Sequence, residues 1–132
     1  MQVLYEDNHI IIVNKAPGEI VQGDKTGDRT LADDVKAYIK EKYAKPGQVF
    51  LGVAHRLDRP VGGVVVFART SKALSRLNGM FRDGDVHKTY WAIVRQAPRQ
   101  AEATLAMSAS TRATPTTARW QGPSKPCCAT RP

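Results

Sequence analysis

The chain has 132 residues, 42% of them hydrophobic, which suits one domain with an apolar core and excludes wholesale disorder or several domains. The net charge is +8, but residues 1–94 carry 14 basic and 11 acidic side chains, so much of the excess lies in residues 95–132 and does not by itself indicate nucleic acid. No membrane-spanning run and no secretory signal are present, and the adjacent Cys127 and Cys128 close no loop, so we expect a cytoplasmic protein.

The first predicted elements are a β-hairpin and a helix. Residues 3–5 and 9–14 are expected to be the two strands, because the second is a β-branched run that follows a short polar turn. Residues 19–29 are polar and rich in glycine, which predicts a surface loop. The helix is expected to begin at Thr30, whose hydroxyl can cap the first turn, and to end before Pro46 with one apolar face buried.

The next predicted elements are two strands, a helix and a last strand. Apolar runs predict strands at residues 49–54 and 64–68, with a polar connection at 55–63. A second helix is expected at residues 70–83, and alternating apolar side chains predict a final strand at 86–94. This order is typical of an α+β fold, with a mixed, mainly antiparallel sheet and two helices.

Residues 95–132 have a different composition from the rest of the chain. Alanine, threonine, proline and serine fill 22 of these 38 positions, and isoleucine, valine, phenylalanine and tyrosine are absent. Such a segment buries too little apolar area to offset its ordering entropy. We therefore expect a folded region at 1–94 and an irregular tail at 95–132. Two interpretations of the tail are open, namely a disordered basic linker and translation in a shifted reading frame from Pro115 onward.

The residues best suited to chemistry lie in the connection from His55 to Gly63. Arg56 and Arg59 flank Asp58 and favour its ionised form, and a positioned carboxylate can act as a nucleophile or as an electrostatic stabiliser. The glycines that end this segment would let a substrate approach the backbone closely. A solvated turn shaped by ion pairs explains the same residues, and the charge pattern alone favours that interpretation.

Three segments of the chain resemble the motifs of one enzyme family. His55–Gly63 (HRLDRPVGG), with the valine-rich strand and the Thr70–Ala73 segment that follow, resembles the signature of the pseudouridine synthases that modify ribosomal large-subunit and related RNAs. The opening from Tyr5 to Gly18 looks like that family's first motif, and His87–Ala92 (HKTYWA) looks like its Lys-x-Tyr-x-Ala strand. The resemblance covers residues 3–94 and implies a pseudouridine synthase-like catalytic core.

The resemblance implies that the protein isomerises uridine to pseudouridine in RNA without a metal or organic cofactor. Asp58 would attack the everted uridine or its sugar, and we expect it to face a pocket that accepts this base. Tyr90 would pack on the base and assist removal of the C5 proton, while Arg56 would help to extrude the nucleotide. Further RNA-binding residues are expected at His55, Arg59, Lys15 and Lys88.

The chain departs from the family pattern at its C-terminal end. Family members continue past residue 94 with more strands and an Arg-x-His-Gln-x-Arg-like segment, which residues 95–132 do not match. We therefore expect an incomplete, C-terminally truncated core with little or no activity of its own. The expected partner is ribosomal or transfer RNA, and the chain is expected to be a monomer.

Other interpretations of these residues are open. The chain could be a non-catalytic RNA-binding fragment, or a small glycosidase or nucleoside hydrolase, although the latter enzymes usually pair two carboxylates. Tyr90 on its own also fits a tyrosine buried in a core strand. The histidines and cysteines lack the spacing of metal ligands, so no metal site is expected.

Overall fold

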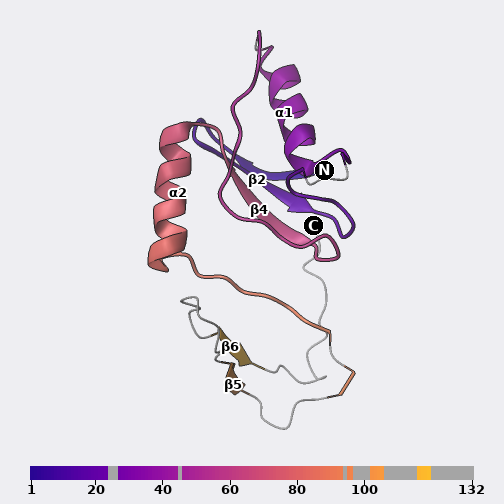
Figure 1. Cartoon of the computed structure of the whole chain (residues 1–132), viewed down its shortest axis with the longest axis vertical. Helices are drawn as coiled ribbons and strands as arrows, with labels where there is room; N and C mark the ends of the chain where they lie inside the picture. Colours follow the sequence, from indigo (N-terminus) through magenta and orange to yellow (C-terminus); the bar gives the residue numbers. More distant parts are fainter. Residues whose placement is uncertain (24–26, 45, 94, 97–101, 106–115, 120–132) are drawn as a thin grey trace. The chain divides into compact units, whose positions relative to one another are not determined.

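The chain forms two compact units, Met1–Val86 and His87–Pro132, in a computed structural model. The boundary falls eight residues before the predicted one. The structure describes residues 1–23, 27–44, 46–93, 95–96, 102–105 and 116–119 (Figure 1).

The first unit is built on a four-stranded antiparallel sheet with the order β1-β2-β4-β3. β1 (Gln2–Glu6) and β2 (Ile10–Lys15) form the predicted hairpin, and β4 (Gly63–Ala68) pairs along the whole of β2. The predicted strand at 49–54 is reduced to β3 (Gly52–Val53) at the edge of the sheet. The sequence therefore predicted the four strands of this unit in their order along the chain, and the α+β class is confirmed.

Helix α1 (Leu31–Lys42) covers one face of the sheet and builds the core with it (Figure 1). Thr30 caps it as predicted, because its hydroxyl accepts a hydrogen bond from the amide of Asp33 at 3.2 Å, and the Asp33 carboxylate accepts one from the amide of Thr30. The fully buried side chains of this layer are Ile11, Val13, Leu31, Val35, Ile39, Val65 and Phe67.

Helix α2 (Ser71–Asp83) packs on the opposite face of the sheet, beside β3 and β4 (Figure 1). Gly52 pairs with Ala68, and both lie on the face of the sheet opposite to that of Phe67. Leu74 of α2 contacts Gly52 on this face. A Cβ atom at position 52 would come within 2.8 Å of the Leu74 side chain, so the absence of a side chain lets α2 approach. Neither helix of the described residues is long and apolar enough to cross a membrane.

The second unit contains an antiparallel pair of short strands, β5 (Glu102–Leu105) and β6 (Thr116–Arg119). The expectation that residues 95–132 are irregular is wrong for these eight residues. Threonine is common in both strands and favours extended backbone, and the two segments satisfy each other's backbone groups.

The strand predicted at 86–94 is not present in the part of it that the structure describes. Residues 86–93 belong to neither sheet, and Tyr90 and Ile93 are 64% and 99% exposed. Alternating apolar residues favour a strand only where a neighbouring strand accepts their hydrogen bonds, and here the described residues supply none.

Glu6 is the centre of a polar cluster that joins β1, the last turn of α1 and the residue that follows β4. Its side chain is 8% exposed and accepts hydrogen bonds from the hydroxyls of Tyr38 and Tyr43, from Lys42 Nζ at 2.8 Å and from Arg69 Nη1 at 3.1 Å. Burial opposes ionisation of this carboxyl, but the hydrogen bonds from Lys42, Tyr43 and Tyr38 outweigh it and lower the pKa of Glu6.

We expect Glu6→Gln to lower the free energy of unfolding by about 2–3 kcal/mol at neutral pH, because the Arg69 side chain, only 7% exposed, would lose its anionic partner. Because the pKa of Glu6 is lower in the folded than in the unfolded chain, its ionised form stabilises the fold above the unfolded pKa of about 4.3. This stabilisation is lost as the pH falls through the folded pKa. The difference between the two proteins should therefore shrink below about pH 4. Urea denaturation across this pH range measures it. Glu41→Gln, at an exposed position of α1, is the control, and equal midpoints at neutral pH would contradict the prediction.

Candidate active site

The candidate site begins with Lys15, whose side chain is only 1% exposed at the end of β2. Its Nζ donates hydrogen bonds to the carbonyl oxygens of Asp58 and Arg59, both at 3.1 Å, and of Val61 at 2.5 Å, with a longer contact to that of Ala16 at 3.3 Å. Among the described residues no carboxylate lies within ion-pair distance of this ammonium. The backbone dipoles of the turn therefore stabilise the charge, and the charge in return holds the turn in place.

The burial of Lys15 contradicts the expectation that it contacts RNA. Ile11 and Val13 of the same strand are fully buried, and the period of two in a strand places Lys15 on the same inward face. That alternation was present in the sequence and could have indicated an internal role.

The turn that carries Asp58 is fastened to the segment after β2. The amide of Val61 donates to the carbonyl of Asp58 at 3.0 Å, which closes the turn, and the amide of Gly18 donates to the carbonyl of Arg59 at 2.7 Å. Lys15 and Gly18 of the first motif therefore contact the turn of the Asp58 motif, about forty residues further along the chain. The structure brings these two of the three motifs together.

Gly62 and Gly63 are needed by the chain itself at this point. A Cβ atom at position 62 would lie 3.1 Å from Pro17 Cδ and 3.2 Å from the carbonyl oxygen of Lys15, which is tighter than ordinary contact. Gly63 has φ +138°, a conformation that favours glycine. The sequence predicted that a substrate would approach the backbone of these glycines closely. In the structure Lys15 and Pro17 of the first motif lie against Gly62 instead.

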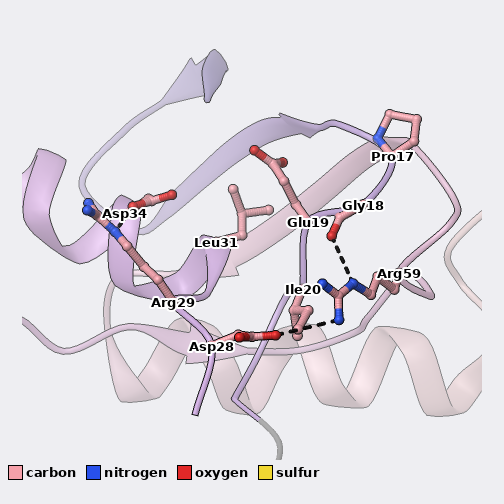
Figure 2. Close-up of a pocket in the computed structure, with 9 residues that line it drawn as sticks. All are labelled: Pro17, Gly18, Glu19, Ile20, Asp28, Arg29, Leu31, Asp34 and Arg59. Atoms are coloured by element: carbon pink, nitrogen blue, oxygen red, sulfur yellow. Dashed lines mark hydrogen bonds and ion pairs between the residues drawn. The ribbon is translucent and has the colours of Figure 1, made fainter. Parts of the chain in front are cut away.

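The side chain of Asp58 is exposed, and no ion pair holds its carboxylate among the described residues. Arg59, expected beside it, is directed elsewhere: its Nη1 lies 3.5 Å from Asp28 Oδ2, and its Nε donates to the carbonyl of Gly18 at 3.2 Å (Figure 2). Arg59 was expected to favour the ionised form of Asp58, but here its guanidinium contacts Asp28 and Gly18 instead. Arg56 is exposed.

Two pockets of the first unit are lined by residues other than Asp58. One, of about 410 Å³, opens between residues 17–20, residues 28–34 and Arg59, and its rim carries both acidic and basic side chains (Figure 2). The other, of about 520 Å³, lies between His9 and the first turns of α2. Asp58 lines neither pocket, so the base pocket expected around it is not one of these two. Among the described residues, no group of three potential metal ligands gathers.

His55 is anchored inside the first unit. Its Nε2 accepts a hydrogen bond from the amide of Val66 in β4 at 3.0 Å, and its ring lies 4.9 Å from that of Phe81 in α2, tilted by 35°. The side chain is half-buried. An RNA-binding role was expected for His55, and these contacts give its ring an internal role that sequence patterning did not signal.

Tyr90 and Lys88 belong to the second unit, and both are exposed. The alternative interpretation of Tyr90 as a buried core tyrosine is wrong, because the side chain is 64% exposed. That Tyr90 packs on the base that Asp58 attacks stays a prediction, and so does the RNA contact of Lys88.

Comparisons with known proteins agree with the motifs. The family model described as RNA pseudouridylate synthase matches residues 9–127, a longer stretch than the three motifs span. The chain is 35% identical over 104 residues to "Pseudouridylate synthase RPUSD4, mitochondrial" of Xenopus tropicalis, covering 79% of this chain and 32% of that protein. It is 34% identical over 93 residues to "Ribosomal large subunit pseudouridine synthase C" of Escherichia coli, covering 70% of this chain and 27% of that protein.

A solved structure supports the fold. "Human RNA Pseudouridylate Synthase Domain Containing 4" superposes with a TM-score of 0.54 at 24% identity, covering 64% of this chain and 30% of that chain. This likeness concerns the arrangement of strands and helices. The chain spans about a third of the length of the curated relatives that it matches.

Proposed function

The chain belongs to the RNA pseudouridylate synthase family, and from this we propose that it isomerises uridine to pseudouridine in RNA, with Asp58 as the catalytic carboxylate. The observation that carries the proposal is the turn built around Asp58. A buried ammonium and the amide of Gly18 hold its backbone, while the carboxylate stays exposed and able to meet a substrate. Whole-protein activity, the RNA target, a monomeric state and a cytoplasmic location are all parts of this proposal.

The reaction is an isomerisation that leaves the composition of the nucleotide unchanged while the C5 hydrogen is exchanged for a solvent hydrogen at N1. The Asp58 carboxylate attacks the everted uridine or its sugar, the N1–C1′ bond breaks, and the base rotates. A C5–C1′ bond then forms and the bond to Asp58 breaks, which restores the carboxylate. The C5 proton leaves to solvent, and N1 takes up a proton from water. Tyr90 stacks on the base, worth roughly 1–3 kcal/mol, and assists removal of the C5 proton.

Exposed cations of the chain hold the RNA strand. Arg56 fills the space that the extruded nucleotide leaves, and Arg59 and Lys88 contact phosphates. Arg59 must leave Asp28 to do so, and this costs little because both side chains are more than half exposed at 3.5 Å separation.

A non-catalytic RNA-binding fragment is the alternative function. One observation favours it: Asp58 lines neither of the two pockets described above. Such a fragment would bind RNA with an affinity that Asp58→Asn leaves unchanged.

Tritium release from RNA labelled at uridine C5 tests the proposal. We expect little turnover from the 132-residue chain, so the protein is used in excess over RNA, and release should be slow but should depend on Asp58. Binding of the RNA without release would contradict the proposal and support the alternative. Release of uracil from free uridine would indicate a nucleoside hydrolase instead.

A further inference from the structure

The last position of the β3–β4 ladder is filled by a side chain. Gly52 pairs with Ala68 and Val53 with Phe67, so the same register would place Ala54 opposite Val66. The chain leaves the sheet at this point, and the imidazole Nε2 of His55 accepts the Val66 amide in place of a backbone carbonyl. His55 therefore marks where the strand ends and the turn toward Asp58 begins.

The hydrogen bond requires a neutral imidazole. Nε2 can accept the Val66 N–H only while it carries no proton, because both nitrogens of a charged imidazole are donors. Contact with Phe81 holds the ring at α2, close to β4.

Within the described part of the chain, the two elements that contact this ring, β4 and α2, carry few charged groups. β4 (GVVVFA) contributes no titratable side chain. On α2, Arg82 and Asp83 next to Phe81 pair with each other at 2.9 Å, and Lys72 and Arg76 lie nearer its first turn. On the segment of His55 itself, Arg56 and Asp58 are exposed.

We propose that His55 is a positioning residue, whose neutral imidazole fixes where the chain leaves the sheet and so orients the turn that presents Asp58. Proton uptake turns Nε2 into a donor that faces another donor, which breaks the bond and releases the start of the turn. The proposal uses the proposed function only for the catalytic role of Asp58.

NMR spectroscopy of the 132-residue chain tests this without need of turnover. Between about pH 7.5 and 5, where histidines usually take up a proton, the Nε2 signal of His55 should change from an unprotonated to a protonated nitrogen. The amide shifts of residues 56–59 should follow with the same midpoint, and hydrogen exchange of the Val66 amide should accelerate. Loop shifts with no common midpoint would overturn the proposal.

Matched variants separate the hydrogen bond from general stability. His55→Gln offers an amide oxygen as acceptor but does not titrate, so it should keep Val66 protected and abolish the pH-dependent loop shifts. His55→Leu should lose about tenfold of that protection, equivalent to one net hydrogen bond. His9→Gln, at an exposed histidine, should change neither. Persistence of the loop shifts in His55→Gln, or equal Val66 exchange in His55→Leu and the native chain, would overturn the proposal.

The tritium assay adds a functional arm. His55→Leu should lower the single-turnover rate constant about tenfold with the protein concentration for half-saturation unchanged, and His55→Gln should restore that rate constant and remove the acid limb of the pH profile. An active chain whose single-turnover rate constant is the same in all three proteins would overturn the positioning role. A chain without turnover would contradict the proposed function alone, because the NMR result still decides whether His55 orders the turn.

Discussion

Replacing Asp58 by asparagine is expected to reduce tritium release by a factor on the order of 10³ or more, because the amide keeps the shape of the side chain but supplies no nucleophilic carboxylate. RNA affinity should stay within about twofold, since one exposed charge contributes little to binding dominated by phosphate contacts. The fold should also be unaffected, because among the described residues no partner holds this carboxylate. Single-turnover release, RNA titration and urea denaturation measure the three quantities.

Asp85→Asn provides the matched control for this substitution. Asp85 is an exposed aspartate just after α2, and the substitution removes the same charge without touching the turn. It should leave release, binding and stability unchanged. Undiminished release from the Asp58→Asn protein, or a parallel loss of RNA binding, would show that the carboxylate is not the catalytic group.

Lys15→Met should be the most destabilising substitution in the first unit, lowering its free energy of unfolding by about 3–5 kcal/mol. Methionine matches the length of lysine, but it donates no hydrogen bond to the carbonyls of Asp58, Arg59 and Val61. The carbonyls of Asp58 and Arg59 would keep only the amides of Val61 and Gly18, that of Val61 would lose the ammonium, and the turn would lose its main attachment to β2. Urea denaturation followed by far-ultraviolet circular dichroism measures the loss.

Lys36→Met is the control for the loss of a positive charge. Lys36 lies on α1 with 45% of its side chain exposed, and its nearest acid is Asp33 at 3.9 Å. This substitution should change the stability by less than about 0.5 kcal/mol. If the two variants unfold at the same urea concentration, Lys15 does not hold the turn. Should Lys15→Met fail to fold, accelerated exchange of the Gly18 and Val61 amides in Lys15→Arg would test the same contacts.

Local signals in the sequence predicted the elements of the first unit well. The cap at Thr30 and the spacing of α1 depend on residues within a few positions of one another, and both appear in the structure as expected. Strand β2 was equally clear from its β-branched run. The prediction of a strand at 86–94 was wrong for the described residues, because alternating apolar side chains do not show whether a neighbouring strand is available for pairing.

The sequence by itself determined the family and pointed to Asp58 as the residue we propose for its chemistry, because motif spacing around Asp58 is a property of the chain order. Only the tertiary structure decided what the neighbouring charged and polar residues do. Lys15 turns inward to the backbone of the turn, Arg59 pairs with Asp28, and His55 completes a strand ladder. The physical reason is that each of these contacts joins residues 11 to 46 positions apart, and folding, not local propensity, brings such partners within hydrogen-bonding distance.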